Sequence, residues 1–167
     1  MERIDAPLVA AERPMLEAWL EFERATLALK CAGLAPEQLA TRSVPPATLS
    51  LLGLVRHMAE VERYWFQRCL VGADRPSIYR TDAERDRAFD GAEPATAAED
   101  LAAWEQECAA SRSVVAGIDS LDTIGAGSWQ DSEVSLRWIL VHMIEEYARH
   151  NGHADLLRQT IDGAVGL

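Results

Sequence analysis

Residues 134–162 repeat apolar side chains with the period of an α-helix, and two ionisable side chains interrupt the apolar stripe. At about 100° per residue, Met143 and Leu157 lie within about 20° of His150, and Glu146 lies about 40° from it on the same stripe. Burying a carboxylate or an imidazole without a partner costs roughly several kcal/mol. The pattern therefore predicts a helix whose Glu and His side chains share a polar partner.

A divalent metal ion is the simplest shared partner. The i, i+4 spacing brings the heads of Glu146 and His150 within about 6 Å of each other. The chain has four His residues, and we expect the third ligand from His57, in the apolar segment 49–70, where it stands about 40° from Val61 at the edge of the apolar face. The sequence therefore predicts a metal site. The alternative is a buried, hydrogen-bonded Glu–His pair without an ion.

Other side chains near this stripe are weaker candidates for a chemical role. We expect His142 and His153 at its margin, about 80° and 60° from its centre, with His142 outside the metal site. Glu62, on the apolar face of the segment 49–70, and His153, one turn beyond His150, are candidates for a general base. The favoured alternatives are an ion pair between Glu62 and an Arg across the bundle, and a hydrogen bond from His153 to a ligand residue. Two aromatic residues are assigned to a pocket wall or to the core: Tyr147 and Trp65.

Composition indicates one compact domain over residues 1–167. The chain is 49% hydrophobic, which is enough for a core. No signal peptide and no run of about 18 apolar residues is visible, so we expect a cytoplasmic protein without a membrane segment. The net charge of −11 argues against a nucleic-acid partner. The cysteines are odd in number and widely spaced, which favours reduced core residues over disulfides or a thiolate zinc site: Cys31, Cys69 and Cys108.

Helix start and stop signals divide the chain into four long helices. No alternation typical of strands is present, so the expected fold class is all-α. A charged connection, residues 73–95, is long enough to be a crossover or a flap over the bundle. The expected helices cover residues 14–32, residues 48–71, a segment opened by a Thr96–Glu99 capping box and ended by Gly125 and Gly127, and a segment from 132–135 to 163.

Four long helices with long connections are typical of a four-helix bundle, whose metal sites are built from side chains on facing helices. Two His and one Glu leave an ion such as zinc with an open coordination position, as in catalytic sites. The same donors also accept nickel, iron or manganese, so zinc is the favoured ion among several.

Two segments resemble the DinB-like superfamily: LLGLVRHMAEVERYWF at residues 51–66 and HMIEEYARHNGHADLLR at residues 142–158. The resemblance covers nearly the whole chain and is closest to the branch of the mycothiol-dependent maleylpyruvate isomerase. It implies a four-helix bundle of up-down-down-up topology and a divalent metal ion held by His57, Glu146 and His150. It also implies a low-molecular-weight thiol as cosubstrate. Despite the superfamily's name, it implies no function on DNA.

The leading hypothesis is a metal-dependent thiol S-transferase or isomerase, in which the ion lowers the pKa of a bound thiol. A metal-dependent hydrolase is the close variant. A non-enzymatic module that binds the metal and a small molecule is the alternative from another class. A purely structural bundle that forms a homodimer is a third hypothesis. Substrate, native metal and oligomeric state are open at this point.

Overall fold

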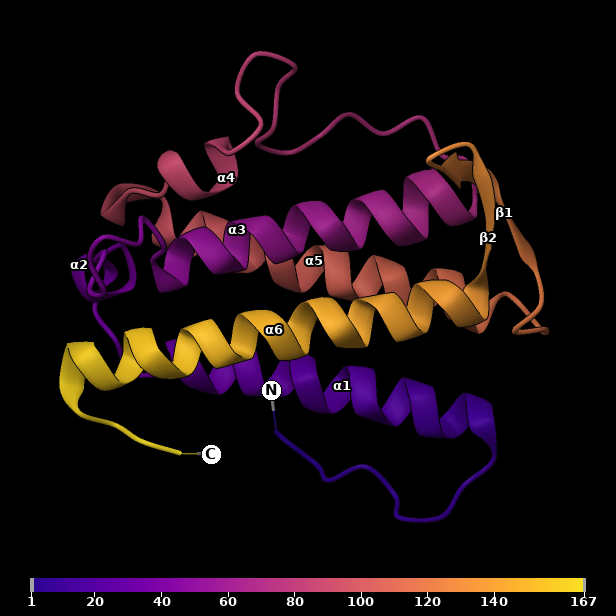
Figure 1. Cartoon of the computed structure of the whole chain (residues 1–167), viewed down its shortest axis with the longest axis horizontal. Coiled ribbons are helices and arrows are strands. Elements are labelled where there is room, and N and C mark those ends of the chain that lie inside the picture. Colours follow the sequence, from indigo (N-terminus) through magenta and orange to yellow (C-terminus); the bar gives the residue numbers. More distant parts are fainter. Residues whose placement is uncertain (1, 167) are drawn as a thin grey trace.

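The computed structural model describes residues 2–166, and four long helices lie along one another in it (Figure 1). Helix α1 packs mainly against α6, and α3 packs mainly against α5. These helices are α1 (Glu12–Cys31), α3 (Leu51–Glu62), α5 (Ala97–Ala116) and α6 (Leu136–Asp162). The other elements are α2 (Pro36–Leu39), the π-helix η1 (Arg63–Leu70), α4 (Arg87–Asp90), the 3₁₀ turn η2 (Pro94–Thr96), β1 (Ile124–Trp129) and β2 (Ser132–Ser135).

Contacts between helix ends define the direction of each long helix. Arg13, at the start of α1, donates hydrogen bonds to the carbonyl oxygens of Val115 (2.7 Å) and Ile118 (2.5 Å) at the end of α5. Element η1 continues α3 and contacts β1, which follows α5. The α3–η1 and α5 helices therefore finish at the end of the molecule where α1 and α6 begin. The segment 71–96 carries the chain back along α3 to the start of α5 (Figure 1).

Residues 124–135 form a β-hairpin, so the expectation that strands are absent was wrong. Strands β1 and β2 pair antiparallel, and Gln130 and Asp131 between them have φ values of 49° and 62°, as a two-residue hairpin turn requires. A Cβ atom at Gly125 would lie 2.8 Å from the carbonyl oxygen of Cys69. The glycine that was expected to break a helix instead lets the hairpin backbone pack against η1.

Two helix starts also differ from the expectation. Helix α3 begins after Ser50, whose side chain accepts a hydrogen bond from the Gly53 amide at 3.1 Å. The expected capping box does not form, because the Thr96 hydroxyl donates to the Asp100 carboxylate at 2.8 Å. The Thr96 side chain therefore makes no capping hydrogen bond to the backbone of α5, and a 3₁₀ turn precedes this helix. The last turns of the predicted helix 48–71 are π-helical.

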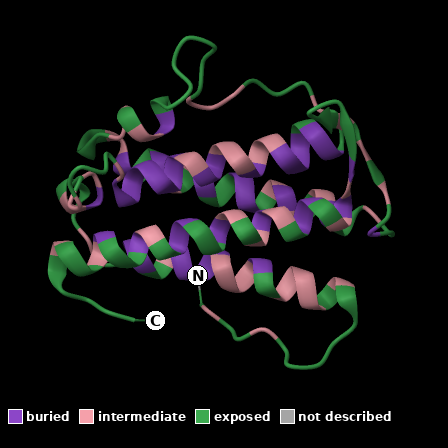
Figure 2. Cartoon of the chain, viewed as in Figure 1, coloured by how far each residue is buried: buried purple, intermediate pink, exposed green. Residues whose placement is uncertain are grey.

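The core lies between the four long helices, on the sides that face one another (Figure 2). Apolar side chains fill most of it, and the three cysteines are buried and unpaired. No helix within residues 2–166 is both long and apolar enough to cross a membrane. Several charged side chains are buried as well, including Arg24 and Glu62. The largest fully buried side chains are Trp104, Tyr147, Phe66, Leu27, Leu51, Leu52, Leu54, Met58, Leu136, Ile139, Leu140 and Met143.

Candidate metal centre

The structure brings together His57 from α3 and Glu146 and His150 from α6. Glu146 Oε2 lies 3.7 Å from His57 Nε2 and 3.5 Å from His150 Nε2. The three potential ligand atoms lie within 4.8 Å of one another. The α6 pair follows from the i, i+4 spacing, whereas His57 comes close because α3 packs against α6.

The imidazole of His57 is held in place, yet its inner nitrogen is unsatisfied. Its ring stacks on Phe89 at a centroid distance of 4.8 Å and meets the His150 ring edge-on at 4.7 Å. Among the described residues, His57 Nε2 is buried and has no hydrogen-bond partner. A buried ring nitrogen without a partner is costly, so this atom is expected to have a ligand that the protein itself does not supply.

Glu146 is the negative group of the cluster. The imidazoles of His150 and, second, of His57 hold the pKa of its carboxyl group well below its usual range, although partial burial acts in the opposite direction. Glu146 is therefore ionised at neutral pH, which is the state that binds a metal ion.

The donor set fits a divalent ion. An ion that is about 2.0–2.1 Å from tetrahedral ligands places two ligand atoms about 3.4 Å apart. The observed donor separations of 3.5 and 3.7 Å are close to this value. Both separations are longer than good hydrogen bonds, so a Glu–His hydrogen-bonded pair explains the geometry less well. Two imidazoles and one carboxylate suit zinc, nickel or ferrous iron.

Two more His side chains flank the three. His153 Nδ1 lies 3.3 Å from His150 Nδ1, as expected for a side chain that orients a ligand imidazole. Burial, followed by the nearby His150 and Arg149, lowers the pKa of His153. On the other side, His142 Nε2 lies 3.6 Å from Glu146 Oε1, which is nearer to the centre than the helical angles indicated.

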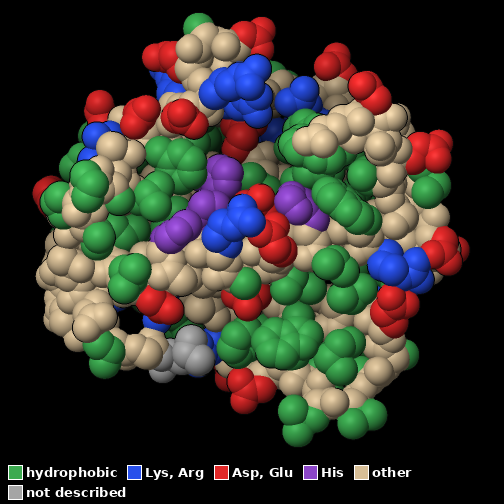
Figure 3. Space-filling model, viewed as in Figure 1, with side chains coloured by type: hydrophobic (Ala, Val, Ile, Leu, Met, Phe, Trp, Pro, Cys, Tyr) green, Lys and Arg blue, Asp and Glu red, His purple; other side chains and the backbone are tan. Residues whose placement is uncertain are grey.

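The centre lies at one face of the molecule. The His side chains stand near the middle of this face, and hydrophobic and charged side chains surround them (Figure 3). The exposed fractions of His57, Glu146 and His150 are 24%, 16% and 11%. The ligands are thus partly shielded but remain accessible to a small molecule.

The chain matches the model of a protein family described as mycothiol-S-transferase, over residues 15–163. It belongs to this DinB-like family. No curated protein matches the chain. A crystal structure described as the conserved protein of locus from Enterococcus faecalis is similar to it, with a TM-score of 0.61 and 16% sequence identity. That similarity covers 93% of this chain and 100% of the other, and at this level of identity it shows the fold alone.

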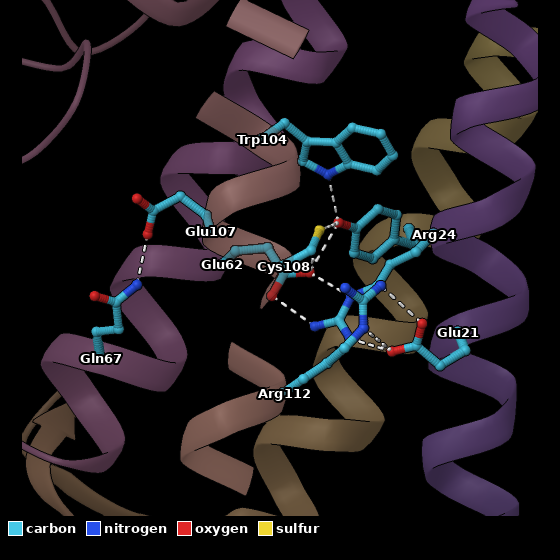
Figure 4. A network of polar contacts seen from close by, with 9 residues as sticks. Glu21, Arg24, Glu62, Gln67, Trp104, Glu107, Cys108 and Arg112 are labelled. Carbon is cyan, nitrogen blue, oxygen red and sulfur yellow. Dashed lines mark hydrogen bonds and ion pairs between the residues drawn. The ribbon is translucent and has the colours of Figure 1, made fainter. Parts of the chain in front are cut away.

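A second cluster of polar side chains lies in the core of this family member (Figure 4). Arg24 of α1 donates two hydrogen bonds to Glu62 of α3, at 2.8 and 2.7 Å. The Tyr147 hydroxyl donates to Glu62 at 2.8 Å and accepts from the indole N–H of Trp104 at 2.8 Å. The expected ion pair between Glu62 and an Arg is confirmed. This carboxylate lies in a saturated buried network and is not available as a general base.

The same network extends to the surface between α1 and α5. Glu21 accepts hydrogen bonds from Arg24 at 2.6 Å and from Arg112 at 2.9 and 2.8 Å. The Cys108 thiol lies 3.6 Å from Glu62 Oε1, and burial together with the charge of Glu62 raises its pKa well above the usual range. The network joins all four long helices, because its members come from α1, α3, α5 and α6.

Sequence reasoning missed Phe89, whose ring holds His57. Phe89 lies in the connection 73–95, in the short helix α4, where only four residues give no periodic signal. Trp65 is 3% exposed and belongs to the core. Its ring meets the ring of His142 at 4.8 Å, so it borders the face that carries the centre.

Proposed function

We propose that the chain is a metal-dependent transferase or isomerase that uses a low-molecular-weight thiol of the mycothiol type. One divalent ion, with zinc favoured and nickel, iron or manganese as the other candidates, would bind His57 Nε2, Glu146 and His150 Nε2. The proposal includes a single domain in which the four long helices follow an up-down-down-up order.

The unsatisfied Nε2 atom of His57 carries this proposal. The atom is buried, lies 3.7 Å from the Glu146 carboxylate and has no hydrogen-bond partner among the described residues. Stacking on Phe89 holds its ring in that orientation. A side chain that is held in one orientation while its donor atom makes no hydrogen bond is typical of a preorganised metal ligand.

A bound divalent ion would supply Lewis acidity, which lowers the pKa of a coordinated thiol and favours the thiolate at neutral pH. The residues determine how strong this effect is. Glu146 contributes one negative charge, while His57 and His150 bind as neutral donors. The ligand set therefore leaves a net positive charge that favours a thiolate over a thiol. Three protein ligands leave an open position for it.

The family supports a thiol as the cosubstrate, because its members are described as mycothiol-S-transferases. None of the three cysteines of the chain is an activated nucleophile. Burial raises the pKa of Cys31, Cys69 and Cys108, so the sulfur nucleophile would be an external thiol. Transfer to an electrophile and thiol-assisted isomerisation both begin with the same thiolate.

The test measures metal, thiol binding and turnover on protein without a His tag. Wild type is expected to retain about one equivalent of divalent metal, to bind mycothiol only when loaded, and to accelerate its reaction with 1-chloro-2,4-dinitrobenzene. His57→Phe keeps a ring beside Phe89 but removes the donor nitrogen. It should lose metal, thiol binding and turnover together while remaining folded.

Each alternative gives a different result. A non-enzymatic binding module would bind the thiol in a metal-dependent manner without forming product. A hydrolase would turn over an ester or amide without thiol. A structural bundle would hold no metal, and a fully loaded His57→Phe variant would refute the proposed ligand set.

A further inference from the structure

The two carboxylate oxygens of Glu146 face different groups of side chains. Oε2 faces the nitrogens of His57 and His150, at 3.7 and 3.5 Å. Oε1 lies 3.6 Å from Nε2 of His142, one turn earlier on α6. A carboxylate whose oxygens are divided in this way is arranged like the bridging ligand of a two-metal site.

The group on the Oε1 side has donors of its own. His142 Nδ1 lies 3.5 Å from Glu145 Oε2. One ligand atom each from His142, Glu145 and Glu146 lie within 4.8 Å of one another. Glu145 and Glu146 lie at opposite nitrogens of the ring, so an ion would bind Nε2 of His142 together with Glu146, and the exposed side chain of Glu145 would rotate toward it. One imidazole nitrogen and two carboxylate oxygens would then form a donor set for a divalent cation such as zinc.

The His142 ring is held in position by two aromatic side chains. It stacks on Trp138 with a centroid distance of 4.8 Å and an interplanar angle of 17°. The ring of Trp65 meets it at 4.8 Å and 71°. Because these contacts already restrict the imidazole, binding an ion costs little further side-chain entropy.

We propose that His142, Glu145 and Glu146 form a second, weaker site for a divalent cation, which shares Glu146 with the centre of the proposed function. Glu145 is 44% exposed and forms an ion pair with Arg149, which the cation must displace. Two cations that share one carboxylate also repel each other, so we expect binding at least about tenfold weaker than at the first site.

Occupation of this second site has a functional consequence. The second cation would share the Glu146 carboxylate with the first and would bind beside His142, whose ring stacks on Trp138. It would therefore compete with substrate for that part of the face. Excess cation should inhibit the loaded protein reversibly, and removal of the excess should restore its activity.

Equilibrium dialysis of untagged protein against increasing free zinc tests the stoichiometry. Wild type should bind two ions, the second at least about tenfold more weakly than the first. His142→Phe keeps a ring against Trp65 and Trp138 but has no donor, and it should bind one ion with unchanged melting temperature. Glu145→Gln should weaken only the second ion. Glu105→Gln, which removes an exposed carboxylate from α5, should still bind two.

Tryptophan fluorescence gives an independent measurement with Co²⁺, a paramagnetic quencher. The second equivalent should quench fluorescence strongly in wild type, because Trp65 and Trp138 adjoin His142. This second phase should be absent in His142→Phe.

The outcomes separate the two sites. One ion in wild type and none in His57→Phe would overturn the second site and leave the first intact. One ion that survives in His57→Phe and disappears in His142→Phe would support the second site and overturn the first. Two ions in both His142→Phe and Glu145→Gln would also overturn the proposal.

Discussion

Arg24 and Glu62 form a two-point ion pair in the core, with N–O distances of 2.8 and 2.7 Å. The side chain of Glu62 is 0% exposed and that of Arg24 is 3% exposed. The pair joins α1 to α3, and through the Tyr147 hydroxyl it also joins α6. A buried pair of this kind is costly to break, because the remaining charge cannot reach water.

Glu62→Gln is therefore expected to destabilise the fold by about 3 kcal/mol, at the lower end for a broken buried pair because Arg24 keeps its contact with Glu21. Urea denaturation measures the change. The double variant Arg24→Met, Glu62→Met should be more stable than Glu62→Gln, since it leaves no buried charge. Glu105→Gln is the surface control and should change stability by less than about 0.5 kcal/mol. A Glu62→Gln variant as stable as this control would contradict the prediction.

Removing the metal ion should lower stability without unfolding the chain. An ion at a free concentration a hundredfold above its Kd adds about 2.7 kcal/mol, which corresponds to roughly 5–10 °C in Tm for a domain of this size. Thermal melts with and without chelator measure this at neutral pH. The difference should vanish near pH 5, where protons compete for the two imidazoles. Complete unfolding on chelation would show that the apolar core contributes less to the stability of the fold than we infer.

Glu146 should make the metal-free protein sensitive to acid. The pKa of its carboxyl group is lowered by His150 and His57. A lowered folded-state pKa stabilises the fold above the ordinary Glu value of about 4.3, and that contribution is lost as the pH falls through the lowered value. At pH 5.5 the urea midpoint of the metal-free wild type should be higher than that of Glu146→Gln. At pH 3 the difference between the two midpoints should be smaller. A gap that is equal at both pH values would argue against this role.

Two glycines provide a matched pair of variants. Gly125→Ala would place a Cβ atom 2.8 Å from the Cys69 carbonyl oxygen, so we expect a loss of about 1–3 kcal/mol. Gly152 lies within α6, and an added Cβ would meet nothing within 4 Å. Gly152→Ala should stabilise the protein by up to about 1 kcal/mol. Chemical denaturation compares the two, and equal effects would refute the packing argument.

The cysteines should be inert in the native protein. Burial raises the pKa of the Cys31 thiol to about 12, and that of Cys108 rises further, with Glu62 contributing. Only the thiolate reacts readily. A colorimetric disulfide reagent at pH 8 should titrate three thiols in urea and react only slowly with the folded chain. Rapid native reaction of one thiol would reveal a nucleophile that the structure does not predict.

Local spacing determined much of this protein directly from the sequence. Apolar periodicity predicted the four long helices, and the i, i+4 interval placed Glu146 and His150 on one face of α6, because helical geometry depends only on separation along the chain. The same periodicity put Glu62 on an inward face, and the predicted ion pair with an Arg is confirmed. Each of these predictions started from the spacing within one helix and the burial of one of its faces.

Only the tertiary structure decided which distant groups meet. Phe89 stacks on His57 across 32 positions of sequence, and Glu62 selects Arg24 from the many arginines of the chain. The hairpin was not predicted, because a glycine at position 125 is typical of a helix end. Its actual role, to let the hairpin pack against the Cys69 backbone, depends on a contact that the sequence does not show. Such contacts depend on how helices pack, and packing brings together residues whose separation along the chain has no fixed period.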